Sequence, residues 1–261
     1  MKIAAVQLDI AWVRPEKNIL RIMELIDNAE PSDLYVLPEM FTTGFAVRSE
    51  KISTQEDDGF IETLKLKAIE KKGAIAGSLA VRTKEGEFRN RFYFFKPDGS
   101  VSYYDKKHLF SYGGENKNFS SGSERTVVEY GGFRFLLQVC YDLRFPVFSR
   151  NFLRASGEAD YDAIIYVANW PEQRIKAWDV LLKARAVENQ AFVIGVNRCG
   201  ADPGNKYNGR SAIISPYGEI ISAEDTGRER IIYAELDLAL LKDFRQSFPV
   251  LADADSFRLD L

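Results

Sequence analysis

Residues that bind metals or form disulfides are scarce in this chain, whose 261 residues include one histidine, His108, and two cysteines, Cys140 and Cys199. No C-x-x-C pair, G-x-G-x-x-G turn or P-loop accompanies them, so we expect no metal and no cofactor. Two widely separated cysteines predict free thiols in a reducing compartment rather than a disulfide framework. A cysteine-dependent reaction must therefore use this one imidazole or a base of another kind.

Strong positive charge and long apolar runs are also absent. The formal net charge of −3 offers no basic surface for nucleic acid. The longest apolar runs are much shorter than the ~20 residues that a membrane-spanning helix needs. Residues 1–8 lead directly into a strand-like run without the features of a secretory signal. We expect a cytoplasmic globular protein that acts on a small molecule, with no nucleic-acid and no membrane partner.

Short apolar runs rich in β-branched residues alternate with segments of helical periodicity. The pattern predicts strands at residues 2–8, 33–37, 74–82, 88–96, 101–104, 126–130, 133–139, 162–168, 191–197, 211–215, 219–223 and 230–235. It predicts helices that begin at Pro15, near Phe60 with a stop at Gly73, near residue 146, at Ile175 and near residue 237. Similar element orders in both halves favour an α/β fold of two mixed sheets packed face to face with helices outside. This is a four-layer αββα sandwich in one domain over residues 1–261.

Cys140 occupies an unusual place for a structural cysteine. The apolar run 133–139 ends immediately before it, and a polar turn follows at 141–146. A thiol at the end of a strand projects into the crevice where α/β sheets hold their ligands. The positive end of a following helix would favour the thiolate that attacks a substrate. We therefore take Cys140 as a candidate nucleophile.

Two further segments place charged residues at strand ends. Glu39 follows the strand at 33–37, where partial burial would suit a general base; a helix cap or a structural ion pair is the alternative. Lys106 and Lys107 are neighbours, so strand alternation turns only one of them inward, where an ammonium would stabilise an oxyanion. The alternative for this pair is a solvated turn.

Together the three segments resemble the nitrilase superfamily of carbon–nitrogen hydrolases. The motifs are Leu-Pro-Glu-Met-Phe at 37–41, Tyr-Asp-Lys-Lys-His-Leu-Phe at 104–110 and Val-Cys-Tyr-Asp-Leu-Arg-Phe-Pro at 139–146. The resemblance implies the αββα sandwich as the fold and Glu39, Lys106 and Cys140 as the catalytic residues. It leaves Lys107 in a variable position and implies a structural role for His108.

The family's chemistry implies a role for each residue. Glu39 takes the thiol proton as Cys140 attacks a carboxamide carbon, and ammonia leaves behind a thioester that water hydrolyses. Lys106 and the backbone N–H of Tyr141 stabilise the oxyanion. Glu115 lies where family members carry a second glutamate that orients the lysine, and a surface carboxylate is the alternative reading for it.

Further segments, at residues 38–45, 169–171, 184–190 and 248–255, resemble the bacterial ω-amidase branch of the superfamily. This resemblance implies hydrolysis of the terminal amide of 2-oxo acids such as 2-oxoglutaramate and 2-oxosuccinamate, which yields a dicarboxylate and ammonia. The alternatives are another amidase or nitrilase specificity on the same three residues, and a non-catalytic binding protein. Superfamily members commonly form homodimers or larger homo-oligomers, which we expect here.

An anionic substrate in a mildly acidic protein requires a local cation. The arginine candidates are Arg144, Arg174, Arg198 and Arg210, and the aromatic candidates for pocket walls are Phe41, Phe45, Tyr141 and Trp170. From these we select Phe41, Trp170 and Arg174 as the substrate-binding residues to test. Arg144 ranks lowest because its place in the cysteine motif suits a structural role. We interpret Cys199 as a bystander thiol.

Overall fold

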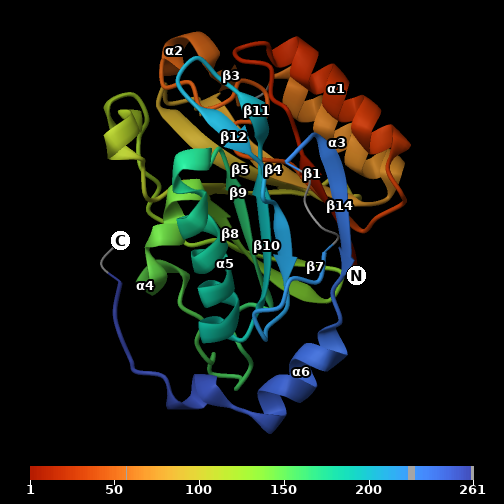
Figure 1. The fold of residues 1–261 in the computed structure, drawn as a ribbon, viewed down its shortest axis with the longest axis vertical. Helices are drawn as coiled ribbons and strands as arrows, with labels where there is room; N and C mark the ends of the chain where they lie inside the picture. Colours follow the sequence, from red (N-terminus) through yellow and green to blue (C-terminus); the bar gives the residue numbers. More distant parts are fainter. Residues whose placement is uncertain (57, 223–226, 260–261) are drawn as a thin grey trace.

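Two β-sheets packed face to face form the centre of the computed structural model, which describes residues 1–56, 58–222 and 227–259 (Figure 1). The seven-stranded sheet has the order β14 (Arg230–Glu235), β1 (Lys2–Gln7), β2 (Leu34–Val36), β4 (Ala74–Arg82), β5 (Phe88–Phe95) and β6 (Val101–Asp105), with β3 (Thr54–Gln55) beside β4. The five-stranded sheet has the order β13 (Ala212–Ile214), β10 (Phe192–Asn197), β9 (Ala163–Ala168), β8 (Phe133–Val139) and β7 (Val127–Tyr130). A separate hairpin consists of β11 (Cys199–Ala201) and β12 (Lys206–Asn208).

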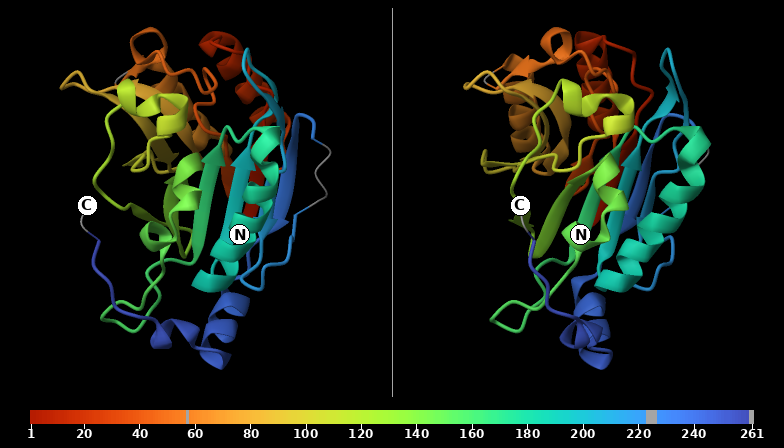
Figure 2. Two further views of the ribbon diagram at one scale, coloured as in Figure 1. Left: turned by 60° about the vertical axis from the view of Figure 1, so that its left-hand side comes forward. Right: turned by 90° about the vertical axis from the view of Figure 1, so that its left-hand side faces the viewer.

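Helices cover the outer face of each sheet (Figure 2). The helices α1 (Pro15–Asn28) and α3 (Gly59–Lys71) pack on the seven-stranded sheet, and α5 (Ile175–Asn189) packs on the five-stranded sheet. The shorter helices are α2 (Ser49–Ile52), α4 (Pro146–Ser149) and α6 (Leu238–Ser247). The 3₁₀ turns are η1 (Ser111–Gly113), η2 (Glu115–Lys117), η3 (Cys140–Arg144), η4 (Glu172–Arg174) and η5 (Val250–Asp253). The predicted αββα sandwich is confirmed by this layer order.

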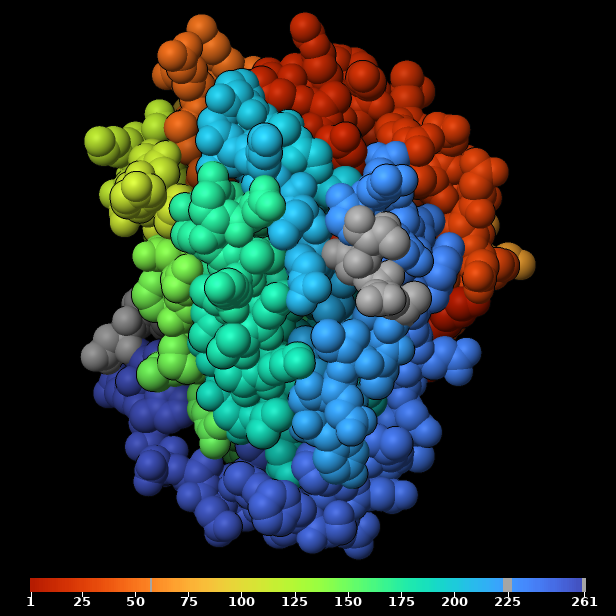
Figure 3. Space-filling model, viewed as in Figure 1, coloured from red at the N-terminus to blue at the C-terminus, as the bar shows by residue number. Residues whose placement is uncertain are grey.

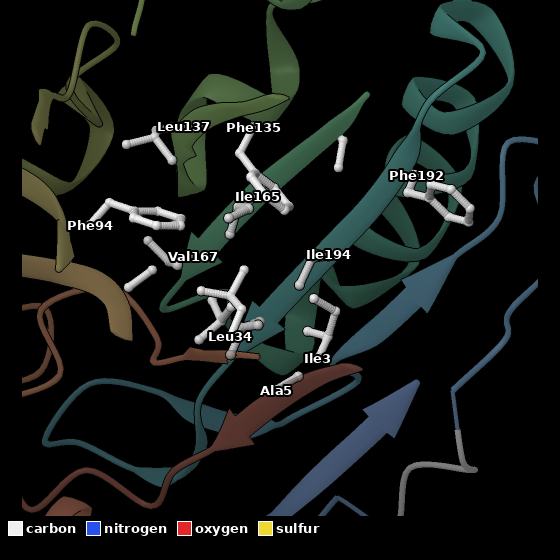
Figure 4. Close-up of a cluster of buried hydrophobic side chains, with 14 of the residues drawn as sticks. Ile3, Ala5, Leu34, Phe94, Phe135, Leu137, Ile165, Val167, Phe192 and Ile194 are labelled. Carbon is white, nitrogen blue, oxygen red and sulfur yellow. The ribbon is translucent and has the colours of Figure 1, made fainter. Parts of the chain in front are cut away.

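The largest hydrophobic core lies between the two sheets (Figure 4). Ile3 and Ala5 of β1 and Ile165 and Val167 of β9 point into it and are fully buried. Ala4, on the opposite face of β1, is also fully buried in the layer beneath the outer helices. Because both faces of these strands are covered, they contain continuous apolar runs. These runs allowed the strands to be predicted from the sequence.

The bounds of the predicted strands agree with the structure to within one residue at each end, with one exception at 219–223. Helix α1 begins at Pro15 as predicted. Helix α3 ends before Gly73, but the residue in the left-handed conformation is Lys72, with φ of 52°. Gly73 is needed for a different reason, since a Cβ there would lie 2.4 Å from the carbonyl oxygen of Ser32.

The observed elements differ from the predicted ones at the following places. The helix predicted from about 146 is only the four-residue α4, because the 3₁₀ turn η3 precedes it and Asn151 turns the chain towards Asn189 of α5. The strand predicted at 219–223 is a single bridge between Ile214 and Ile220, and residue 223 lies outside the described residues. The hairpin of β11 and β12 was not predicted, because its strands are short and lack apolar alternation. Of the helices in the described ranges, none is long and apolar enough to cross a membrane.

Candidate active site

Four polar side chains from distant parts of the chain meet, and three of them follow the carboxyl ends of strands. Glu39 follows β2 and Lys106 follows β6, both in the seven-stranded sheet, whereas Cys140 follows β8 in the five-stranded sheet. Glu115 lies on η2. Glu39, Lys106 and Glu115 are fully buried, and Cys140 is half-buried. The fold thus brings together the residues that the sequence predicted for the chemistry, from both sheets.

Lys106 joins the two buried carboxylates. Its Nζ atom lies 2.8 Å from Oε1 of Glu39 and 2.9 Å from Oε2 of Glu115. Burial by itself lowers the pKa of this lysine, but the charges of Glu115 and then of Glu39 outweigh burial, so the net pKa of Lys106 is raised. Lys106 is therefore a cation held inside the site.

The two carboxylates also share a single amide donor. Nδ2 of Asn90 lies 2.9 Å from Oε1 of Glu39 and 2.9 Å from Oε1 of Glu115. Burial raises the pKa of Glu115, while Lys106 and the hydrogen bond from Asn90 oppose that rise. The backbone N–H of Phe110 donates to Oε2 of Glu115 at 2.6 Å. Glu115 is therefore part of this buried network, and the alternative of a surface carboxylate is wrong.

Cys140 has a constrained backbone at the start of η3. Its φ of 46° lies in the left-handed region, which is uncommon for residues other than glycine and recurs at functional turns. Burial raises the pKa of its thiol well above the usual value, and Glu39 raises it further against the opposing effect of Lys106. The expectation that a helix end favours the thiolate is wrong, because η3 is a short 3₁₀ turn and burial dominates. The neutral thiol is the resting form, so a base must take its proton.

Asp142 anchors the turn that carries Cys140. Its carboxylate accepts hydrogen bonds from the backbone N–H of Val139 at 2.8 Å and of His108 at 3.0 Å, and from the Tyr104 hydroxyl at 2.9 Å. Nδ1 of His108 also lies 2.8 Å from this carboxylate. Asp142 thus ties the cysteine turn to the segment that carries the lysine, and the single histidine belongs to this anchor.

A second asparagine positions Glu39 from the other sheet. The backbone N–H of Asn169 donates to Oε2 of Glu39 at 2.9 Å, and Nδ2 of Asn169 donates to the carbonyl oxygen of Glu39 at 2.6 Å. Asn169 follows β9 of the five-stranded sheet, whereas Asn90 lies in β5 of the seven-stranded sheet. The Glu39 carboxylate is therefore held by one donor from each sheet besides Lys106.

A cavity of about 310 Å³ opens beside Cys140. Its lining includes the aromatic and cationic residues Phe45, Phe110, Tyr141, Arg144, Trp170 and Arg174. Tyr141, Trp170 and Arg174 therefore lie where the sequence placed them. Phe41 does not, because it is fully buried between the seven-stranded sheet and its outer helices.

Two arginines of the lining present guanidinium groups without an anionic partner in the part of the chain that the structure describes. The guanidinium carbon of Arg144 lies 4.9 Å from the centre of the Trp170 ring. That of Arg174 lies 5.4 Å from the centre of the Phe110 ring. Because stacking on a ring leaves the N–H edges of a guanidinium available, both side chains can bind an anionic substrate.

The remaining arginine candidates do not line this cavity. Arg198 is fully buried and donates to backbone carbonyls, and Arg210 forms an ion pair with Asp179 at 2.9 Å. Arg144, which was ranked lowest from the sequence, is thus better placed to contact a molecule in the cavity than Arg198 or Arg210. Cys199 is buried away from the lining. Among the described residues, no group of three or more His, Cys, Asp or Glu side chains is arranged to hold a metal ion.

Asn90, Asp142 and Asn169 are parts of the site that the sequence reasoning missed. Asn90 precedes Phe92 and Phe94, which point into the core between the sheets, and it shares their strand alternation. A lone polar residue on an inward-facing strand position is a usable signal, because buried polar groups need partners. Asp142 and Asn169 lie within the motif segments, but their contacts with other segments leave no local pattern.

Comparison with known proteins now identifies the class. The family model described as carbon–nitrogen hydrolase matches residues 2–246. The chain is 43% identical over 260 residues to the omega-amidase YafV of Escherichia coli strain K12, covering 99% of this chain and 98% of the relative. It is 35% identical over 263 residues to the 2-oxoglutaramate amidase of Bacillus subtilis strain 168, again covering 99% and 98%.

A solved structure gives the same result. XC1258 from Xanthomonas campestris, described as a CN-hydrolase superfamily protein, superposes with a TM-score of 0.95 at 39% identity, covering 99% of this chain and 98% of that chain. The protein therefore belongs to the carbon–nitrogen hydrolase family, and the resemblance drawn from its three motifs is confirmed.

Proposed function

We propose that this protein hydrolyses the terminal carboxamide of small 2-oxo acids, such as 2-oxoglutaramate and 2-oxosuccinamate, to the dicarboxylate and ammonia. The observation that carries the proposal is the meeting of Glu39, Lys106 and Cys140 beside a cavity lined by Arg144 and Arg174. The names of the two bacterial relatives, omega-amidase and 2-oxoglutaramate amidase, support this substrate class.

The first half of the proposed reaction forms a thioester. Glu39 accepts the thiol proton as Sγ of Cys140 attacks the amide carbon, which suits a thiol whose pKa burial has raised. Lys106 and the backbone N–H of Tyr141 stabilise the oxyanion, and loss of one such donor typically costs ~3 kcal/mol of transition-state stabilisation. Glu39 then gives the proton to the amide nitrogen, the C–N bond breaks and ammonia leaves.

Water completes the proposed reaction. Glu39 takes a proton from water as the water oxygen attacks the thioester carbon, and the second oxyanion uses the same donors. The C–S bond then breaks, Cys140 regains its proton and the carboxylic acid leaves. One amide and one water thus yield one acid and one ammonia. Glu115 takes no proton in this scheme, and it orients Lys106 through the second ion pair.

We infer that the substrate carboxylate binds Arg174, with Arg144 as the second cation and Trp170 as a wall of the pocket. A planar guanidinium matches a carboxylate in geometry and charge. Asp202, a carboxylate in the cavity lining, already accepts hydrogen bonds from two backbone N–H groups of its own loop and from the Tyr207 hydroxyl. It is therefore poorly placed to receive an α-ammonium group, which favours 2-oxo acids over amino acids such as glutamine.

We further propose a cytoplasmic protein that forms a homodimer or a larger homo-oligomer. Both cysteines are free thiols, the form that a reducing compartment maintains. Helix α5 lies at the surface in Figure 3, and its residues Val180 and Val187 are 65% and 53% exposed. Exposed apolar side chains two turns apart on one helix favour association between chains. Light scattering should give a dimer or larger mass that Val180→Lys reduces, and a monomeric parent would contradict the proposal.

Ammonia release provides the test of the reaction. We would assay 2-oxoglutaramate and succinamate beside glutamine and a simple aliphatic nitrile, with Cys140→Ala as the control. We expect fast, cysteine-dependent release from the first two compounds only. Release from another amide or from the nitrile instead would retain the three catalytic residues and replace the substrate. No release from any compound would favour a non-catalytic binding protein.

A further inference from the structure

Asn90 connects the two carboxylates of the site through one side-chain amide. Its Nδ2 atom lies 2.9 Å from an oxygen of Glu39 and 2.9 Å from an oxygen of Glu115. An amide nitrogen carries two hydrogens, so one is available for each carboxylate. Asn90 is 1% exposed, so water cannot readily replace either hydrogen bond.

The orientation of this amide follows from its surroundings. Ionised carboxylates only accept hydrogen bonds, so Nδ2 rather than Oδ1 of Asn90 must face them. Oδ1 is buried and has no hydrogen-bond partner in the described part of the chain. An orphaned buried acceptor is unfavourable. Asn90 therefore occupies a position where its own acceptor is energetically unfavourable. This is expected when its two N–H donors are needed to bind the carboxylates of the site.

The backbone of Asn90 is held as firmly as its side chain. The residue pairs with Ala80 in the ladder between β4 and β5, and its carbonyl oxygen accepts the backbone N–H of Lys106 at 3.0 Å. Asn90 thus touches the segment that carries the lysine and also both carboxylates that the lysine binds. Its amide donors are presented from a fixed place.

The charges of the site explain why such a donor matters. One ammonium faces two carboxylates, and neighbouring carboxylates disfavour each other's ionised forms. Burial raises the pKa of Glu115, whereas the hydrogen bond from Asn90 lowers it. The titratable groups that face Glu39 are Lys106 from the end of β6, Glu115 from η2 and Cys140 from η3. Of these groups, only Lys106 brings positive charge.

We propose that Asn90 is a positioning residue that holds the carboxylates of Glu39 and Glu115 on Lys106 through one amide and so keeps Glu39 placed to accept the thiol proton. The inference rests on the proposed role of Glu39 as the base. Without the amide, the pKa of Glu115 rises further, so Glu115 retains its proton up to a higher pH and no longer pairs with Lys106 as an anion below it. Substrate binding is spared, because Asn90 does not line the cavity.

The test compares the pH dependence of kcat/KM in the parent protein and in Asn90→Leu with 2-oxoglutaramate. We expect the acid limb to move to higher pH by about one unit or more, because that limb reports the group that must be deprotonated. We expect kcat at neutral pH to fall by up to roughly 10-fold, the largest loss that a one-unit shift can cause, while KM changes by no more than about twofold. Asn90→Ser, which is smaller and keeps one donor, should shift the limb less.

Gln138→Leu is the matched control. Gln138 is also fully buried, but its Nε2 donates to the backbone carbonyl of Leu137 instead of a carboxylate. This variant should lower the Tm without moving the acid limb. An unmoved limb in folded Asn90→Leu and Asn90→Ser would overturn the proposal. Failure of both variants to fold would also overturn it, because Asn90 would then be a structural residue.

Alkylation of Cys140 by iodoacetamide separates this inference from the substrate assignment. Its rate depends on transfer of the thiol proton and requires no knowledge of the substrate. We expect the rate to rise with pH in the parent and the same rise to occur at higher pH in Asn90→Leu. If alkylation shifts but the parent does not hydrolyse 2-oxoglutaramate, the proposed substrate is rejected and the role of Asn90 is retained. If the parent hydrolyses 2-oxoglutaramate but alkylation does not shift, the substrate is retained and the role of Asn90 is rejected.

Discussion

Cys140 and Cys199 follow parallel strands of the same sheet, β8 and β10, and burial raises the pKa of both thiols. The surroundings of the two sulfur atoms are otherwise different. Cys140 begins a turn beside a cavity and faces Glu39 and Lys106. Cys199 lies within β11, whose backbone is paired with β12, and burial raises its pKa to about 12.

Burial alone makes a thiol inert. Removing a thiol from water disfavours the thiolate, and this applies to both residues. At Cys140 a carboxylate can accept the proton and an ammonium can hold the resulting anion. At Cys199 the charge of Asp9 likewise raises the pKa of the thiol and that of Arg198 lowers it, but Arg198 donates to backbone carbonyls and Cys199 does not line the cavity. We therefore expect reactivity where a carboxylate and a cation meet a thiol at an open cavity.

The largest expected difference is between removal of one thiol and removal of the other. Cys140→Ala should lower turnover of 2-oxoglutaramate by roughly 10⁴-fold or more, since no other group can form the thioester. Cys199→Ala should retain turnover within about threefold of the parent, because it does not line the cavity. Ammonia release measures both. Comparable losses of turnover in the two variants would show that the two thiols do not differ in function.

Removal of the partners of Cys140 should make its environment resemble that of Cys199. We expect Glu39→Gln to lower kcat by roughly 10²- to 10⁴-fold through loss of the base, and Lys106→Met by roughly 10²- to 10³-fold through loss of an oxyanion donor. Circular dichroism should show an intact fold in both variants. Near-normal kcat in either would exclude that residue from the mechanism.

The arginines at the cavity should affect binding more than chemistry. Arg174→Ala and Arg144→Ala should each raise KM for 2-oxoglutaramate by roughly 10- to 100-fold, the range for a hydrogen bond to a charged group, and should change kcat less. A neutral amide substrate should be nearly unaffected. Arg210→Ala is the matched control, because Arg210 pairs with Asp179 away from the cavity. An unchanged KM in both cavity variants would place the carboxylate site elsewhere.

The smallest expected effect concerns stability at high pH. The pKa of Cys199 is about 12 in the folded chain and ~8.5 when exposed, so the unfolded state loses this proton first as pH rises. The thiol therefore stabilises the fold fully below pH ~8.5, and this contribution is lost as pH rises towards 12. In Cys199→Ser the free energy of unfolding should fall less steeply with pH over this window than it does in the parent. The two falls should differ by on the order of 1 kcal/mol at pH ~10. Urea unfolding at several pH values measures it, and parallel curves would contradict the buried environment.

The position of a candidate residue could be predicted from the sequence where that residue follows a recognisable strand. Glu39 and Cys140 each follow an apolar run, so their place at a sheet edge was predictable. Phe41 was wrongly predicted to line the pocket. The sequence pattern around an aromatic residue near such an edge is the same whether the residue packs in the core or faces a cavity. Arg144 was ranked lowest because its position in a motif suggested a structural contact, whereas the structure places its guanidinium over the Trp170 ring at the cavity.

The order of strands and helices, the three motifs and the family could be read from the sequence, because they depend on local periodicity and on spacing along the chain. Three contacts became evident only in the folded chain: Asn90 lies between two carboxylates, Asn169 reaches Glu39 across the two sheets, and Cys140 rather than Cys199 lies beside a carboxylate at the cavity. Asn90 and Asn169 are 51 and 130 positions from Glu39. No local pattern encodes such a contact, because it exists only when two separately formed sheets pack against each other.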